Sequence, residues 1–164
     1  MAQGDVFIYE KFMERLGDGE INLSTAVVKC ILTSDTTGAP PGGGVTASDP
    51  RYGAGGTQNV GTNECSAGGG YATGGVAIDG TDPWALTGNQ GVYTAQNGAW
   101  TSSASGDPTN INYGVFYVDN GGTTDYAIGY VQVYDGATSV SLLAGDVTIK
   151  WNGGATEGTL FTLS

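Results

Sequence analysis

Hydrophobic and polar positions alternate over short runs in the second half of the chain, and turn residues separate these runs. Dipeptides such as Asn97-Gly98 and Asp135-Gly136 recur at intervals of about 8 to 12 residues. This alternation, with its β-branched and aromatic residues, predicts a series of short antiparallel strands. The predicted strands cover 71–78, 92–95, 99–102, 111–119, 126–134, 138–143, 146–151 and 159–163.

A further strand is predicted near the N-terminus, over residues 25–33. It is apolar on both faces, with Val28 and Cys30 on one side and Val27 and Ile31 on the other. A strand of this kind belongs in the middle of a sheet or beneath a helix.

One helix is predicted, over residues 5–16. Apolar residues recur at every fourth position from Ile8 to Leu16, Asp5 can serve as the N-cap, and Gly17 can end the helix. No helical pattern occurs between the later strands, which argues against a parallel α/β sheet.

The hydrophobic periodicity disappears between residues 34 and 70, where glycine is frequent and Pro40-Pro41 interrupts the chain. A connection of this length without regular structure is uncommon within a compact domain. We predict an extended loop or arm here. The whole chain, 1–164, is then a single all-β domain, an antiparallel β-sandwich or barrel with one short N-terminal helix and a long Gly/Pro-rich arm.

The charge balance narrows the range of partners. The chain has 16 acidic and 5 basic residues and a net charge of −11, so it should repel nucleic acid and anionic membranes. The N-terminal residues lack the apolar core of a signal peptide, and no run approaches the 18 apolar residues of a membrane span. We expect a protein made in the cytoplasm that binds neither nucleic acid nor membrane.

The chain has no histidine. This excludes Ser-His-Asp and Cys-His nucleophilic systems and removes the commonest zinc ligand. We expect no enzymatic activity and no catalytic residues, although a carboxylate pair for glycoside hydrolysis is kept as an alternative. The aspartates near turns are interpreted as turn and strand-end residues: Asp79, Asp82, Asp107, Asp119, Asp125, Asp135 and Asp146.

The motifs for binding calcium or phosphate are weak in this sequence. Residues 79–82 and 119–121 place oxygen ligands in tight turns but lack the spacing of a calcium-binding loop. The glycine runs 42–44 and 68–70 are not followed by the helix start and lysine of a phosphate-binding loop. We expect no metal and no cofactor.

The cysteines and tryptophans are expected to be structural. Cys30 and Cys65 should be free thiols, because a reducing compartment disfavours a disulfide. Trp84, Trp100 and Trp151 could form a sugar-binding platform, but a core or contact role suits tryptophans in strands better.

Several sequence blocks resemble small virion proteins of tailed phages. The first runs Phe12-Met-Glu-Arg-Leu-Gly-Asp-Gly-Glu-Ile-Asn-Leu-Ser-Thr25 and continues through Val28-Lys-Cys-Ile-Leu32. The second is Asn63-Glu-Cys-Ser-Ala-Gly-Gly-Gly-Tyr-Ala-Thr-Gly-Gly-Val76, and shorter matches lie at 113–117, 128–131 and 145–151. The resemblance follows the chain in order except at 35–62, and its motifs are structural.

The resemblance implies a structural protein of the virion with no active site. We expect it to decorate or cement the outer surface of the capsid, where strongly negative copies are kept away from packaged DNA. The expected partner is the major capsid protein, and a homo-oligomer, such as a trimer at a three-fold position of the lattice, would match the repeated surface. The alternative is a tail-associated or fibre-associated component that binds a receptor.

Overall fold

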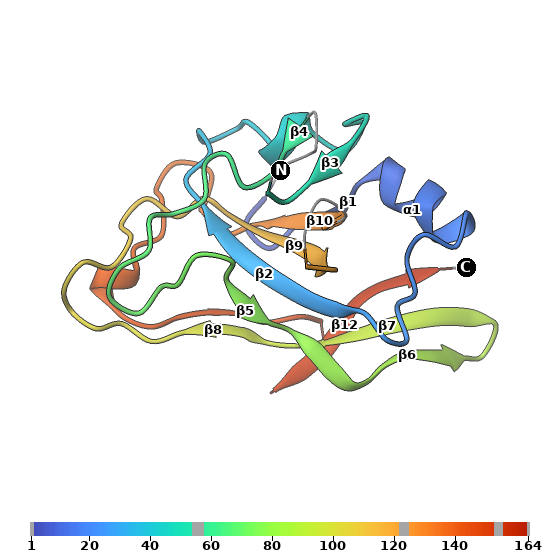
Figure 1. Cartoon of the computed structure of the whole chain (residues 1–164). Coiled ribbons are helices and arrows are strands. Elements are labelled where there is room, and N and C mark those ends of the chain that lie inside the picture. Colours follow the sequence, from blue (N-terminus) through green and yellow to red (C-terminus); the bar gives the residue numbers. More distant parts are fainter. Residues whose placement is uncertain (1, 54–57, 122–124, 153–155, 164) are drawn as a thin grey trace.

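A computed structural model describes residues 2–53, 58–121, 125–152 and 156–163, without the side chains of Thr81 and Asp82. It has one α-helix, and most of the regular structure in this part of the chain is antiparallel strand, which confirms the all-β prediction (Figure 1). The elements in order are β1 Val6–Ile8, α1 Glu10–Gly17, β2 Val27–Thr33, η1 Pro41–Gly43, β3 Pro50–Arg51, β4 Gln58–Asn59, β5 Val76–Ala77, β6 Asp79–Thr87, β7 Gln90–Gln96, β8 Gly98–Trp100, β9 Tyr113–Asp119, β10 Ala127–Gln132, η2 Leu142–Ala144, β11 Val147–Ile149 and β12 Glu157–Leu163.

The largest sheet has five strands in the order β1-β10-β9-β2-β5. Neighbouring strands in this sheet are all antiparallel. Strand β2 pairs with β9 over its whole length, from Val27 opposite Asp119 to Thr33 opposite Tyr113. The position of β2 between β9 and β5 agrees with its prediction as a strand inside the sheet, because both of its faces are apolar.

The second layer consists of two smaller sheets, β12-β7-β6 and β11-β8. Strand β8 follows β7 after the single residue Asn97, and β11 and β12 pair with β8 and β7 respectively. In Figure 1 these strands run beneath the five-stranded sheet, which gives a sandwich-like arrangement of two layers.

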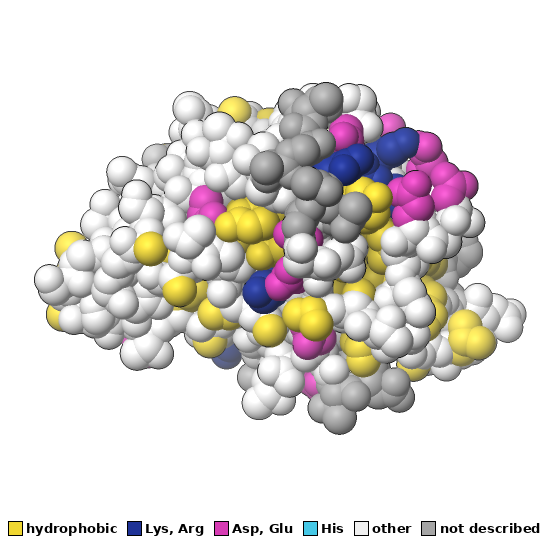
Figure 2. Space-filling model, viewed as in Figure 1, with side chains coloured by type: hydrophobic (Ala, Val, Ile, Leu, Met, Phe, Trp, Pro, Cys, Tyr) yellow, Lys and Arg dark blue, Asp and Glu magenta, His cyan; other side chains and the backbone are white. Residues whose placement is uncertain are grey.

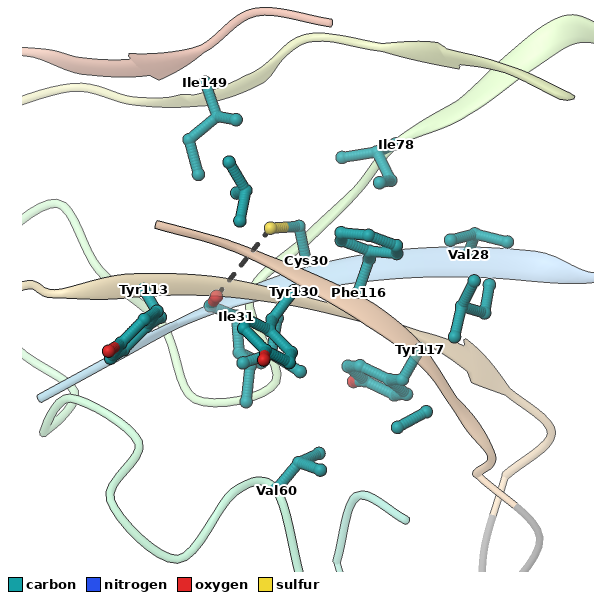
Figure 3. Close-up of a cluster of buried hydrophobic side chains, with 14 of the residues drawn as sticks. Val28, Cys30, Ile31, Val60, Ile78, Tyr113, Phe116, Tyr117, Tyr130 and Ile149 are labelled. Carbon is teal, nitrogen blue, oxygen red and sulfur yellow. Dashed lines mark hydrogen bonds between the residues drawn. The ribbon is translucent and has the colours of Figure 1, made fainter. Parts of the chain in front are cut away.

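Side chains from the two layers meet on one face of the five-stranded sheet. Phe116 packs edge-on against Trp151 with ring centroids 5.7 Å apart, and Cys30 lies on the same side (Figure 3). Ile78 and Ile149 approach from the second layer in the same view. All five residues are buried, so this face is the main sheet-to-sheet core.

The opposite face of the same sheet is covered by irregular chain. We call residues 34–53 and 58–70 the cover segment, because Tyr52 and Val60 within it lie over this face, while its end at Gly68 to Gly70 packs against residues 101–107. Val60 lies beneath Ile31 and Tyr117 in Figure 3, and Tyr52 stacks on Tyr117 with centroids 4.4 Å apart. Val60 is 1 % exposed.

The cover segment is the region predicted as an extended loop or arm, and its described part packs against the domain. It is irregular as expected, but its described residues bury Pro41, Ala47, Pro50, Val60 and Cys65. The physical reason is the sheet itself: apolar side chains on its outer face would otherwise be exposed to water. Residues 54–57 of the predicted arm lie outside the described residues.

The helix is shorter than predicted. It begins at Glu10 rather than near Asp5, because Val6–Ile8 instead forms β1 and pairs with β10. Tyr9 is the N-cap and makes no side-chain cap hydrogen bond. Pairing of β1 with β10 therefore decides the structure of residues 6–8, although an apolar residue at every fourth position from Ile8 favours a helix.

Among the predicted strands, 92–95, 99–102, 111–119, 126–134, 146–151 and 159–163 correspond to β7 to β12 with shifted ends. The predicted strand 138–143 is wrong, since it contains one isolated bridge at Val140 and the start of η2. Only residues 76–77 of the predicted strand 71–78 form a strand, because Gly74 and Gly75 adopt positive φ angles. Strand β6 was missed, because Asp79-Gly80 was interpreted as a turn.

Candidate functional site

A groove of about 890 Å³ lies between the edges of the two layers. We call it the open-side groove. Residues of β1 and the end of β10 line one side, and residues of β11 and β12 line the other. On this side β1 and β10 belong to one layer and β11 and β12 to the other, and the two layers do not share a strand.

The free edge of β1 borders the groove on one side, and β12, whose Thr159 is bridged to Asn152, borders it on the other. Strand β1 is the last strand of the five-stranded sheet, and β12 is the last strand of its own sheet. An edge strand directs alternate backbone N–H and C=O groups away from its sheet, where another chain can bind them. The groove therefore offers both backbone hydrogen-bonding groups and a cavity between them.

The groove lining is mixed in character. Val147, Ile149 and Phe161 contribute largely buried apolar surface, while Val6 is 39 % exposed. The charged residues that line it are Asp5, Asp146 and Lys150. An apolar lining with a few charged groups suits an extended protein segment.

The carboxylates nearest the groove are held by backbone amides. Asp146 accepts a hydrogen bond from the Ser102 N–H at 2.8 Å, and Asp5 accepts one from the Ala2 N–H at 2.6 Å. These contacts fix the local backbone around each carboxylate.

The other turn aspartates behave in the same way. Each accepts at least one hydrogen bond from a backbone N–H, as their interpretation as turn and strand-end residues predicts. The donors are Val28 to Asp79; Gly70, Ser103 and Ala104 to Asp107; Gly121 to Asp119; Asn120 to Asp125; and Ala137 and Thr138 to Asp135. The side chain of Asp82 lies outside the described residues. The structure thus uses these carboxylates to hold loops, except for Asp79, which joins the start of β6 to β2.

Hydrogen bonding lowers the pKa of several of these carboxyl groups. The Gly70 N–H lowers the pKa of Asp107, the Lys29 ammonium at 2.6 Å lowers that of Asp119, and the Thr138 N–H lowers that of Asp135. A carboxyl group that acts as a general acid near neutral pH needs a raised pKa. The shifts at these three residues have the opposite direction.

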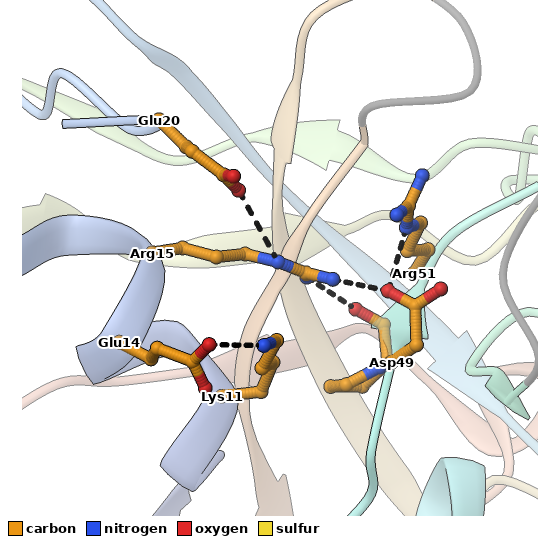
Figure 4. Close-up of polar contacts among 7 residues, drawn as sticks. Lys11, Glu14, Arg15, Glu20, Asp49 and Arg51 are labelled. Carbon is orange, nitrogen blue, oxygen red and sulfur yellow. Dashed lines mark hydrogen bonds and ion pairs between the residues drawn. The ribbon is translucent and has the colours of Figure 1, made fainter. Parts of the chain in front are cut away.

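Charged residues also gather where α1 meets the cover segment (Figure 4). The buried Arg15 forms ion pairs with Asp49 and Glu20, and its guanidinium lies 3.9 Å from the ring centroid of Tyr126. Arg51 also pairs with Asp49, at 2.7 Å. Burial opposes the ionisation of Asp49, but the hydrogen bonds from Arg51 and Arg15 lower its pKa. This cluster fastens the cover segment to the helix.

Glu64 is a second fastening point for the cover segment. Its carboxylate accepts hydrogen bonds from the Tyr52 hydroxyl at 2.7 Å, the Tyr71 hydroxyl at 2.8 Å and the Gly74 N–H at 2.7 Å. Desolvation raises the pKa of both tyrosines, and the hydrogen bonds to Glu64 add to this. The two hydroxyls therefore stay protonated, and together with the Gly74 N–H they hold the segment in place.

The described part of the chain contains neither a cluster of metal ligands nor a reactive thiol. Within those residues, no group of three or more histidine, cysteine, aspartate or glutamate side chains is arranged to hold a metal ion. Cys30 and Cys65 are buried free thiols. Burial raises the pKa of both, that of Cys65 to about 12, so neither forms a thiolate nucleophile near neutral pH.

The tryptophans do not form a shared sugar platform. Trp100 and Trp151 are buried, at 2 % and 3 % exposure, which agrees with the prediction of core roles. Trp84 is half-buried on β6. No two of these rings are thus presented together on the surface.

Comparison with known proteins found no relative: no family model, no curated protein and no solved structure matches the chain. Within the residues that the structure describes, no helix is both long enough and apolar enough to cross a membrane.

The open-side groove is not predictable from local sequence patterns. Val6 was predicted to lie in a helix, and the groove residues of β11 and β12 are separated from it by most of the chain. The one available signal was the alternation of Val147 and Ile149 with polar residues, and it predicts a strand without saying which strand edges stay free.

Proposed function

We propose that this chain is a non-enzymatic structural protein of a tailed-phage particle that decorates or cements the outer surface of the capsid. The observation that carries the proposal is the ordered series of sequence blocks that resemble small virion proteins of tailed phages. The major capsid protein is the proposed partner, and the particle surface is the proposed location.

The use of polar groups in the fold supports a role in contacts rather than catalysis. Six of the seven turn aspartates have described side chains, and all six hold backbone amides. The chain also has no histidine, so few groups remain that could transfer protons near neutral pH.

The open-side groove supports the proposal because it can receive an extended segment of a capsid subunit. A strand added at β1 would hydrogen-bond to the free edge and place alternate side chains toward Val6 and Ile149. Many such contacts, repeated over a lattice, give strong attachment even when each one is modest.

Particles of the phage that encodes this chain provide the first test. Mass spectrometry of purified virions should detect the protein in hundreds of copies, and particles stripped of it should lose resistance to heat. Absence from virions, or presence in only a few copies, would contradict the decoration role.

A matched pair of variants tests the groove on the same particles. Val6 and Val27 are similarly exposed, at 39 % and 43 %, but only Val6 lines the groove. We expect Val6→Asp to weaken rebinding to stripped particles by about tenfold or more, a loss on the scale of one buried aliphatic contact. Val27→Asp should rebind like the unmodified protein. Equal rebinding of both variants would exclude the groove as the contact.

A further inference from the structure

The hairpin of β6 and β7 extends beyond the sandwich core. We call residues 84–91 the hairpin tip. Residues 85–90 are all exposed, and Leu86 is 81 % exposed, whereas no other large hydrophobic side chain in the described residues exceeds 45 %. In Figure 2 the tip lies at the lower right, among hydrophobic and uncharged side chains.

The tip is well-formed β structure. Gly88 has a φ of 63° at the first position of the two-residue turn Gly88-Asn89, as a type II′ hairpin requires. Trp84 lies across Gly91, where an added Cβ would approach the indole to 2.5 Å. The glycine therefore makes room for the ring, and the tip keeps its shape.

Strand β6 has a free edge. It is the last strand of the order β12-β7-β6, and Thr87 pairs with Gln90 next to the turn. In a two-residue hairpin this closing pair is hydrogen-bonded, so the alternate residues Leu86 and Trp84 direct their N–H and C=O groups outward. Natural edge strands usually carry charges or proline that block such pairing.

The part of this edge next to the turn, residues 84–87, carries no charge, whereas Asp79 and Asp82 lie at the other end of β6. Residues 83–106 form the longest run without a charged side chain in a protein of net charge −11. Pro83 lies within β6, but the strand alternation directs its backbone toward β7, where the pairing register shifts between Asp79 and Trp84. The free edge from Trp84 to Thr87 is consequently open.

We propose that the hairpin tip is a self-association surface, and that its partner is β6 of a second copy of this chain. Two copies that each carry −11 repel each other over most of their surfaces. At the uncharged tip, two copies can meet without bringing like charges together. An uncharged edge also offers no electrostatic attraction to a charged partner protein, which favours a second copy of this chain as the partner.

The strand alternation fixes the register of this contact. With a two-fold axis at Ala85, the outward groups of Leu86 in one copy meet those of Trp84 in the other, and the reverse contact follows by symmetry. The two three-stranded sheets then become one six-stranded sheet across the dimer. The two-fold axis gives a dimer, not the trimer that a three-fold lattice position favours. This inference does not depend on capsid binding.

The contact is small compared with the roughly 1,200 to 2,000 Å² of a standard stable interface. We therefore expect a dissociation constant between about 10 µM and 1 mM. Sedimentation equilibrium of the full chain over this concentration range should show a reversible monomer–dimer equilibrium. Dimerisation should strengthen as salt screens the net charge.

Two variants locate the contact. Leu86→Asp places like charges near the two-fold axis and should raise the dissociation constant by about tenfold or more. The control is Leu143→Asp, at a leucine that is 45 % exposed on η2, and it should leave the constant unchanged. Matching circular dichroism and melting curves would show that both variants fold.

A cysteine pair tests the register. Ala85 lies opposite its own copy at a non-hydrogen-bonded position, where Cβ atoms are about 4.5 to 5.5 Å apart, so A85C should form a disulfide-linked dimer on oxidation. Leu143→Cys should not. The proposal would be overturned by a monomer at 1 mM, by a trimer, by equal effects of the two aspartate variants, or by equal cross-linking of the two cysteine variants.

Discussion

The cover segment and the hairpin tip are both rich in glycine, yet they have opposite relations to the core. The cover segment contains little regular structure but buries Val60 and Cys65 against the domain. The hairpin tip is regular antiparallel strand but exposes Leu86 almost fully. Regular backbone structure and burial are therefore independent properties in this protein.

The difference arises from what each region lies against. The cover segment meets the outer face of the five-stranded sheet, and Arg15 and Glu64 fasten it there. The hairpin tip extends past the second layer, and only Trp84 covers part of it. An irregular segment can thus be a fixed part of the fold, while a strand can remain available for a partner.

The largest expected effect comes from placing one charge in each region. Val60→Asp buries a carboxylate without a partner and should lower the free energy of unfolding by about 3–5 kcal/mol. Leu86→Asp should change it by less than about 0.5 kcal/mol at concentrations where the protein is monomeric. Urea denaturation measures both. A small effect of Val60→Asp would mean that the cover segment is detached in solution.

Thiol labelling compares the same regions without changing the cover segment. Cys65 lies buried there and its pKa is raised to about 12, so it should react with a disulfide reagent at least about a hundredfold more slowly than a free thiol. The exposed thiol of a Leu86→Cys variant should react at the ordinary rate. Fast labelling at Cys65 in the unmodified protein would show that the segment opens readily.

Removal of a fastening point should have an intermediate effect. Glu64→Ala leaves the hydroxyls of Tyr52 and Tyr71 and the N–H of Gly74 without their acceptor, and should cost about 1–3 kcal/mol. Glu64→Gln keeps an acceptor oxygen and should cost less. Hydrogen exchange should show the change at the cover segment and not at the hairpin tip.

The smallest effect is expected from acid. The pKa of Asp49, in the cover segment, is lowered in the folded protein, so its stabilising contribution is present near neutral pH. This contribution is lost as the pH falls below about 4 and through the folded pKa. Because Asp49 is partly exposed, the loss should be below about 1 kcal/mol. Asp49→Asn should flatten the acid limb of stability measured by thermal unfolding, whereas a pH profile identical to that of the unmodified protein would contradict the role of the ion pairs.

Much of the fold could be predicted from local patterns. The strands β2, β9 and β10 carry β-branched and aromatic residues on both faces, and the turn aspartates hold backbone amides as expected. These features depend on neighbours in the sequence, so a local pattern contains the information. The same limit explains the error at Val6–Ile8, where pairing with the distant strand β10 decided the structure. The error at β6 has a local cause, because Asp79-Gly80 resembles a turn, although β6 pairs with the neighbouring strand β7.

By itself, the sequence determined the all-β class, the main strands and the lack of histidine-based chemistry. The tertiary structure alone decided that residues 34–53 and 58–70 cover a sheet, that β1 borders a groove, and that β6 keeps a free edge. The physical reason is that strand direction and turn chemistry are set by nearby residues. Burial and free edges depend instead on which distant surfaces meet when the chain folds.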